Sequence, residues 1–359
     1  MSITKKKISH DIILSKLKLA TDKILSNFID SFESHLPLGG EIDDLSAYYK
    51  LPMFFALSGQ KELSKITLSY IFKRFMHVDG DFKSSIKIKS IKPEYTHFWT
   101  YFNGWILRSM YKSGFKIPYK AASFFELFDK GNGLIKTGSL DSSNNSSDLL
   151  TIAHYGMYYL ESNQIDKATK MSTSLIDLVK TQEDLSKQVY LKIDSDGQLI
   201  KEFPADEQMF YSVNKRGEQL YFMTAYPCAF LASYFQKTND IDSLNAAKVY
   251  MNYMLSCEHI YESRFSHKTA WAASILYLET LDPLYLEISD NIISSFIGKQ
   301  DKSGFWFTDE GEETSYDQTA ELGCWFLEIS SNIKLAQKKI KLEETSLSDE
   351  HKSNRTLVI

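Results

Sequence analysis

Residues 266–297 read SHKTAWAASILYLETLDPLYLEISDNIISSFI, and this stretch decides the fold. Its first half, Ser266 to Leu281, is rich in Ala and aromatic residues and has few charges after its first turn, which predicts a helix enclosed on all sides. Its second half, Pro283 to Ile297, has apolar residues at three-to-four spacing with charges between them, which predicts an amphipathic helix with one solvent-exposed face. The polar turn around Asp282 separates the halves. The stretch therefore predicts a hairpin of one inner and one outer helix.

The same alternation runs through the rest of the chain. Further enclosed segments are Asp43 to Leu57, Tyr95 to Ser113, Asp148 to Leu160, Gln219 to Phe235 and Asp317 to Ile329. Further amphipathic segments are Asp11 to Glu33, Lys61 to Phe75, Pro118 to Phe128, Ile165 to Lys180 and Ile241 to Cys257. The last inner segment has no outer partner after it, so the leading amphipathic helix supplies one. The pattern predicts an all-α fold, an (α/α)6 toroid of six helical hairpins.

Two segments depart from the hairpin pattern. Alternating residues in Val189 to Ile193 and in Leu199 to Phe203, around Asp196-Gly197, predict a short β-hairpin flap. After Ile333 the chain turns to Lys, Glu and Ser with few apolar residues, which predicts a frayed helix and then a disordered tail. The expected organisation is one toroid domain over residues 9–333 and a charged C-terminal tail over residues 334–359.

Composition limits the classes of function. A chain of 359 residues with 23 Phe, 21 Tyr and 5 Trp can build a large core, and a formal net charge of -5 argues against a strongly basic nucleic-acid binder. The first 23 residues mix Lys with apolar residues, unlike a signal peptide, and no later segment approaches about 18 uncharged apolar residues. We therefore expect a cytoplasmic protein without a membrane span, and leave its oligomeric state open.

Sequence motifs indicate neither a metal nor a cofactor. The three cysteines lie far apart without CxxC spacing, and the sequence contains no phosphate-cradling Gly-rich loop, no HExxH and no GxSxG. The expected partner is a small-molecule substrate rather than a nucleic acid.

The hairpin count resembles the α/α-toroid superfamily, which includes terpenoid cyclases, protein prenyltransferases, six-hairpin glycosidases, unsaturated-uronide hydrolases and sugar 2-epimerases. Residues 300–306, QDKSGFW, resemble the Gln-x-x-x-Gly-x-Trp end of the terpenoid-cyclase repeat and follow an outer helix, where that repeat belongs. Residues 41–44, EIDD, resemble the acidic Asp-x-Asp-Asp motif of class II cyclases but differ in the first residue. The resemblance implies a central cavity and, at Asp44, a proton donor.

In such a ring the inner helices begin at one rim, so polar residues of their first turns converge on the mouth of the cavity. Glu321 lies four residues after Asp317 in an otherwise apolar helix, which predicts a carboxyl group with a raised pKa that can act as an acid or base. His267 and Lys268 begin a buried helix together, which is costly unless they face a polar cavity. The expected catalytic residues are Asp44, His97, His267, Lys268, Asp317 and Glu321.

Aromatic residues near the same rim predict walls for a substrate, because rings stack on sugars and shelter carbocations. The expected substrate-binding residues are Trp99, Tyr101, Trp105, Asp148, His154, Tyr155, Tyr226 and Trp271. Structural roles are the alternative. Carboxylates at the start of helices act as caps, Lys268 pairs with Glu321 or Asp317, and rings at helical spacing pack in the core.

Three functions remain open at this level. The leading hypothesis is an enzyme that cyclises or isomerises a small organic metabolite with acid/base groups in an aromatic-lined cavity. The second is a six-hairpin glycosidase, uronide hydrolase or sugar epimerase, in which paired carboxylates or histidines act on a sugar. The third is a non-enzymatic binding scaffold. A mostly apolar cavity favours cyclisation, a charged and hydrogen-bonding lining favours sugar chemistry, and a solid centre favours the scaffold.

Overall fold

The computed structural model describes residues 9–356, and these residues form the alternating helices expected from the sequence. The inner helices are α2 (Leu51–Leu57), α6 (Tyr101–Ser113), α8 (Leu149–Glu161), α11 (Phe222–Thr238), α13 (His267–Thr280) and α15 (Glu312–Thr356). The outer helices are α1 (His10–Asp30), α3 (Lys61–Phe75), α7 (Tyr119–Glu126), α9 (Ile165–Lys180), α12 (Ile241–Leu255) and α14 (Pro283–Gly298).

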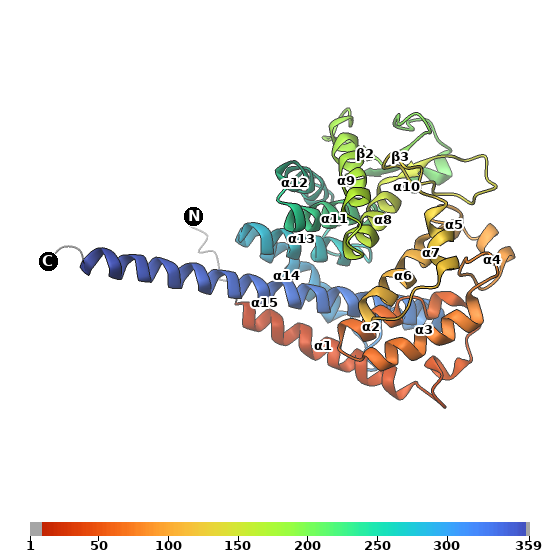
Figure 1. Cartoon of the computed structure of the whole chain (residues 1–359), viewed down its shortest axis with the longest axis horizontal. Coiled ribbons are helices and arrows are strands. Elements are labelled where there is room, and N and C mark those ends of the chain that lie inside the picture. Colours follow the sequence, from red (N-terminus) through yellow and green to blue (C-terminus); the bar gives the residue numbers. More distant parts are fainter. Residues whose placement is uncertain (1–8, 357–359) are drawn as a thin grey trace.

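The inner helices contact one another in a closed cycle. Helix α2 packs against α6, α6 against α8, α8 against α11, α11 against α13, α13 against α15, and α15 returns to α2. Each inner helix also packs against an outer partner, and the partner of α15 is α1, which lies beside it (Figure 1). The leading outer helix therefore closes the ring, as predicted.

The first inner segment starts later than the sequence suggested. Residues Leu45–Ala47 form a 3-10 turn, and α2 begins only at Leu51. Pro52 stands in the first turn of α2, where its missing N–H leaves no hydrogen bond unmade. The other short elements are α4 (Ile86–Ile91), α5 (Pro93–Thr96), α10 (Gln208–Tyr211) and the 3-10 turns Pro37–Gly40, Ala205–Glu207 and Thr308–Glu310.

The β structure lies in the predicted segment but pairs differently. Strand β2 (Gln188–Tyr190) pairs with β4 (Ser212–Asn214), and β3 (Lys192–Ile193) pairs with β1 (Ser147–Asp148), all antiparallel. The expected partner segment 199–203 makes only an isolated bridge, between Leu199 and Ile193. Pairing β2 with β4 buries both Val189 and Val213, while the local turn is closed by backbone hydrogen bonds from Ile200 to Lys192 and from Asp194 to Gln198, each 2.9 Å.

A glycine turn follows α3 and recurs after α14. The second copy lies at the closing seam, the place where α1 packs against α14 and α15 and closes the ring. Gly80, after α3, has a φ of 91°, and a Cβ atom there would lie 2.2 Å from the carbonyl oxygen of Lys120 in α7. Gly304, after α14, has a φ of 86°, and its Cβ would lie 2.9 Å from Cγ of Lys23 in α1. Helix α1 thus packs against the turn after α14 as α7 packs against the turn after α3.

The Gln-x-x-x-Gly-x-Trp segment stabilises this seam. Gln300 Nε2 donates to the carbonyl oxygens of Gly304 at 2.9 Å and Ala20 of α1 at 3.3 Å. The indole N–H of Trp306 donates to the carbonyl oxygen of Phe296 at 2.8 Å. The residues that carry the cyclase resemblance therefore join helices in this chain.

Helix α15 includes the segment from Lys334 in which the sequence predicts a frayed helix followed by a disordered tail. The helix continues to Thr356 and projects past the other helices (Figure 1). Ala336 is buried, and Lys339 Nζ donates to the carbonyl oxygens of Leu278 and Glu279 at 3.4 Å, so the extension still contacts the end of α13. Lys, Glu and Leu also favour a helix intrinsically. Within residues 9–356, no helix is both long and apolar enough to span a membrane.

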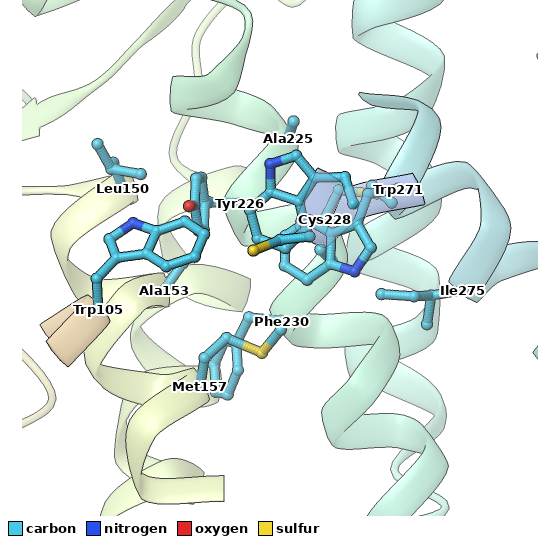
Figure 2. Packing of buried hydrophobic residues seen from close by; sticks show 14 of the residues in the cluster. Trp105, Leu150, Ala153, Met157, Ala225, Tyr226, Cys228, Phe230, Trp271 and Ile275 are labelled. Carbon is cyan, nitrogen blue, oxygen red and sulfur yellow. The ribbon is translucent and has the colours of Figure 1, made fainter. Parts of the chain in front are cut away.

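The centre of the ring is filled by aromatic side chains. Trp105, Tyr226 and Trp271 come from α6, α11 and α13 and lie close together (Figure 2). The rings of Trp271 and Trp325 stack with centroids 4.1 Å apart, and Tyr226 meets Trp271 edge-on at 5.6 Å. All four side chains are buried. This aromatic layer leaves room for a hollow only nearer the rim.

Candidate active site

A cavity of about 290 Å³ lies at the rim where the inner helices begin. Each inner helix contributes, either through its first turns or through the segment that leads into it, because the ring brings all six starts together. The lining residues are Ser46, Tyr49, Lys50, Lys92, Tyr95, Phe98, Tyr101, Phe102, Leu150, Phe222, Phe265, Lys268, Glu313, Thr314, Asp317, Gln318 and Glu321.

Four charged side chains form a buried network on one wall. Lys50 Nζ lies 2.8 Å from Asp317 Oδ1 and 2.6 Å from Glu321 Oε2, and Lys268 Nζ lies 2.8 Å from Glu321 Oε1. Asp317 is the most accessible member, with 15% of its side chain exposed. Among the described residues, no group of three or more His, Cys, Asp or Glu side chains is arranged to hold a metal ion.

Neighbouring groups fix the two carboxylates. Gln318 Nε2 donates to Asp317 Oδ2 at 2.7 Å, and the indole N–H of Trp325 donates to Glu321 Oε1 at 3.3 Å. His267 Nδ1 donates to the carbonyl oxygen of Arg264 at 2.9 Å, which leaves Nε2 at 3.8 Å from Glu321 Oε2. The positions 317, 321 and 325 share one face of α15 because they are four residues apart.

The carboxyl groups differ in pKa. Burial raises the pKa of Asp317, and the charge of Glu321 adds to the rise, while Lys50 opposes it. Burial also acts on Glu321, but Lys268 and Lys50 outweigh it and hold the pKa of that carboxyl well below its usual range. The prediction of a raised pKa at Glu321 is therefore wrong, because two lysines contact its oxygens. The raised pKa belongs to Asp317.

Lys50 and Lys268, the two lysines of the network, also differ in pKa. Burial lowers the pKa of Lys268 to about 8, although Glu321 partly opposes this. Burial disfavours the charge of Lys50 too, but Asp317 and Glu321 together outweigh it and raise its pKa. Burial lowers the pKa of His267 to about 4, so this imidazole is neutral near pH 7.

Several predicted residues meet at the cavity. Lys268, Asp317, Glu321 and Tyr101 line it, and His267 lies directly behind Glu321. The ion pair between Lys268 and Glu321 is the one that the sequence suggested as a structural alternative. The sequence analysis missed Lys50, although a lone lysine between Ala47 and Phe55 in an apolar segment was a usable signal.

Asp44 and Asp148 cap helices and do not line the cavity, which corrects their assignment as catalytic and substrate-binding. Asp44 accepts from the backbone N–H of Ser46 at 2.9 Å and from Ser84 Oγ at 3.2 Å. Asp148 accepts from the N–H of Thr151 at 2.6 Å and from its hydroxyl at 3.0 Å. Both aspartates therefore have the helix-capping role that the sequence analysis gave as the structural alternative to a functional one.

His97 and Trp99 lie at a second hollow of about 480 Å³, away from the ion-pair network. Lys192 Nζ donates to His97 Nδ1 at 2.9 Å, and Glu207 Oε2 lies 3.9 Å from His97 Nε2. Their expected place at the cavity is wrong, because among residues 95–100, which precede α6, only Tyr95 and Phe98 line the cavity, while His97 and Trp99 line the second hollow.

The remaining predicted residues belong to the core beneath the cavity, which corrects their expected contact with a substrate. Tyr155 stacks on Phe125 at 3.7 Å and donates its hydroxyl to the carbonyl oxygen of Phe125. Trp105, His154, Tyr226 and Trp271 are buried and do not line the cavity. The hydroxyl of Tyr226 lies 3.2 Å from that of Tyr101, so this layer supports the cavity floor.

Comparison with solved structures identifies the class of fold. The chain is similar to a D-mannose isomerase (TM-score 0.61, 10% identity, 91% of this chain and 99% of that chain). It is also similar to a family 76 α-mannanase from Bacteroides thetaiotaomicron, with a TM-score of 0.60 and 13% identity over 91% of this chain and 99% of that chain. A type II terpene cyclase from Scytonema matches with a TM-score of 0.55 and 13% identity over 89% of this chain and 99% of that chain. The predicted α/α toroid is confirmed.

At the level of sequence, no family model and no curated protein matches the chain. The cavity of this chain is lined by two lysines and two carboxylates in one ion-pair network and by aromatic rings, of which Tyr49 and Phe222 lie beside the lysines.

Proposed function

We propose that the protein is an enzyme that isomerises or epimerises a small, sugar-like carbonyl compound by proton transfer. The observation that carries this proposal is the mixed lining of the cavity. Its charged groups can bind hydroxyl and carbonyl oxygens, and rings such as Tyr49 and Phe222, which lie beside Lys50 and Lys268, can cover the apolar face of a sugar. A volume of about 290 Å³ is at the small end for ligand sites, which suits a single metabolite.

Asp317 is the proposed acid/base group. Its carboxylate accepts the proton from the carbon next to the carbonyl group, and the negative charge that develops on the carbonyl oxygen is stabilised by the ammonium group of Lys268. In an isomerisation the proton of the neighbouring hydroxyl group passes to the former carbonyl oxygen, and the carboxyl group of Asp317 returns its proton to the former carbonyl carbon. In an epimerisation the planar intermediate turns over before the carboxyl group returns the proton to the original carbon. Lys50 and Glu321 hold these two groups in place.

Glycoside hydrolysis fits less well. Asp317 and Glu321 lie one helical turn apart and both contact Lys50, so they stand on the same side of the cavity instead of flanking a bond. The likeness to a D-mannose isomerase supports an isomerase among the sugar enzymes. The centre of the ring is filled, as the scaffold alternative requires, but the hollow at the rim gives room for a small molecule.

Cyclisation is the second candidate, and the raised pKa of Asp317 favours it. A carboxyl group that holds its proton beside Tyr49 and Tyr101 can protonate an alkene and leave the cation near aromatic rings. The network of lysines and carboxylates in the lining and the small volume favour the isomerase over this candidate.

The test is proton exchange in D2O. Purified protein is incubated with a panel of aldoses, ketoses and 2-acetamido sugars, and deuterium at the carbon next to the carbonyl is followed by NMR. We expect exchange and a new isomer with at least one sugar, loss of both in Asp317→Asn, and retention in the surface control Glu126→Gln. If no sugar exchanges, the proposal fails, and a cyclic product from a polyprenyl substrate would establish the second candidate instead.

A further inference from the structure

The two buried lysines of the cavity have unequal surroundings. Lys50 is held between two carboxylates, at 2.8 Å from Asp317 and 2.6 Å from Glu321. Lys268 contacts only Glu321, at 2.8 Å, and shares that carboxylate with Lys50. Its other neighbour is the ring of Phe222, whose centroid lies 5.2 Å from Nζ. The positive charge of Lys268 is thus less compensated by carboxylates than that of Lys50, although both side chains line the same cavity.

This setting favours a neutral amine at Lys268. The charged or titratable groups that face it are Glu321 and Asp317 on α15, Lys50 before α2 and its neighbour His267. A lysine becomes nucleophilic when an apolar wall and a second cation disfavour its charge. Consistently, burial lowers its pKa to about 8, whereas the pKa of Asp317 is raised. The neutral amine of Lys268 and the protonated carboxyl group of Asp317 are therefore both more accessible forms than in free side chains.

We propose that Lys268 is a covalent catalytic residue that forms an imine with the carbonyl carbon of an aldehyde or ketone bound in the cavity. The inference deepens the proposed function and rests on it for the class of substrate. The imine would draw electrons from the neighbouring carbon more strongly than a hydrogen bond to the carbonyl oxygen does, which makes the proton taken by Asp317 easier to remove.

The step balances within the residues of the cavity. The amine nitrogen of Lys268 attacks the carbonyl carbon and forms a C–N bond, and the carbonyl oxygen takes one proton from the carboxyl group of Asp317 and one from the nitrogen. The C–O bond then breaks and water leaves. The products are a protonated imine on Lys268, whose nitrogen lies beside Glu321, and the carboxylate of Asp317. That carboxylate is then the base for the next proton.

The experiment traps the imine by reduction. Wild-type protein is treated at pH 7.5 with glycolaldehyde and sodium cyanoborohydride, and labelled lysines are located by peptide mass mapping. The matched controls are Lys50 in the same cavity and the partly exposed Lys167 on the outer surface. An ordinary lysine has a pKa of about 10.4, so the neutral fraction of Lys268 is larger by about 100-fold at this pH. We expect Lys268 to be labelled at least about tenfold faster than either control.

Two further measurements separate the outcomes. Lys268→Arg keeps the positive charge beside Glu321, and we expect a folded protein by circular dichroism without the label. Equal labelling of Lys268 and Lys167, or faster labelling of Lys50, would overturn the inference. If Lys268→Arg still exchanges sugar protons at the wild-type rate, the imine is wrong and the proposed function stands. If Lys268 is trapped but no sugar exchanges its proton, the imine stands and the proposed function fails.

Discussion

Lys50 Nζ and Glu321 Oε2 lie 2.6 Å apart although 271 residues separate them in the chain. Both side chains are almost completely buried. The contact joins the start of the first inner helix to the last inner helix, which are the two elements that meet where the ring closes. A buried ion pair with both partners present roughly balances its desolvation, but removal of one partner leaves an uncompensated charge. The closure of the ring and the cavity wall therefore depend on the same contact.

Glu321→Gln should destabilise the fold strongly, because it leaves Lys268 without a carboxylate and Lys50 with only one. We expect the free energy of unfolding in urea to fall by about 3–5 kcal/mol. The matched control is Glu126→Gln, which removes an exposed pair with Lys167 and should cost less than about 1 kcal/mol. Adding Lys268→Met to Glu321→Gln should recover part of the loss. Equal effects of Glu321→Gln and the control would show that the network contributes nothing to stability.

Asp317→Asn should remove the acid/base group while it keeps the shape of the side chain. We expect the rate of proton exchange with a sugar substrate to fall by at least about 100-fold, the usual contribution of such a group. In the wild type, lowering the pH through the raised pKa of Asp317 protonates the base, so the rate should fall on the acid side. Measuring the rate against pH checks both points. An acid limb that persists in Asp317→Asn would assign the titration to another group.

The fold could be predicted from the sequence because its two kinds of helix differ in how many faces are apolar. Six inner and six outer segments were placed in order, and the start of α2, the break before α6 and both ends of α15 were misplaced. Residues 97–100, between α5 and α6, contain no proline or glycine that would signal the break. The β pairing of Val189 with Val213 is decided by burial against the ring.

The candidate site was predictable where its parts are local. Asp317 and Glu321 share a helix face, and Lys268 begins a buried helix, so their convergence follows from the ring. Lys50 was missed because its partners lie at the far end of the chain. The pKa of Glu321 was predicted with the wrong sign for the same reason, since burial alone raises it and only the distant Lys50 and Lys268 lower it.

Acid should destabilise the protein below about pH 6.5 because buried histidines must stay neutral. Burial, with the charge of Arg108, lowers the pKa of His154 to about 3, while the unfolded chain binds the proton near 6.5. The unfolded state therefore takes up more protons as the pH falls, and stability is lost between these two values. At pH 5 this one residue should cost about 2 kcal/mol relative to pH 8.

His154→Leu should remove that part of the acid sensitivity. The rings of Tyr101 and Tyr226 surround position 154, with centroids 5.0 and 5.8 Å from the imidazole, so an apolar side chain suits it. We expect the difference in unfolding free energy between pH 8 and pH 5 to shrink by about 2 kcal/mol. Urea unfolding at the two pH values measures it, and an unchanged difference would place the acid sensitivity elsewhere.

Three turn glycines should respond to alanine in a graded order, because they share a backbone conformation but differ in what surrounds them. Gly59, Gly304 and Gly80 have φ values of 84°, 86° and 91°. A Cβ would meet nothing within 4 Å at Gly59, a side-chain carbon at 2.9 Å at Gly304 and a backbone oxygen at 2.2 Å at Gly80.

Gly59→Ala should therefore cost only the strain of the left-handed conformation, about 1–2 kcal/mol. Gly80→Ala should cost about 1–3 kcal/mol more, because the backbone of α7 must shift. Gly304→Ala should fall between them, since Lys23 of α1 can move only by giving up its 2.6 Å contact with the carbonyl oxygen of Asp301. Urea unfolding of the three variants measures the order, and equal losses would mean that the turns do not fix the spacing of the outer helices.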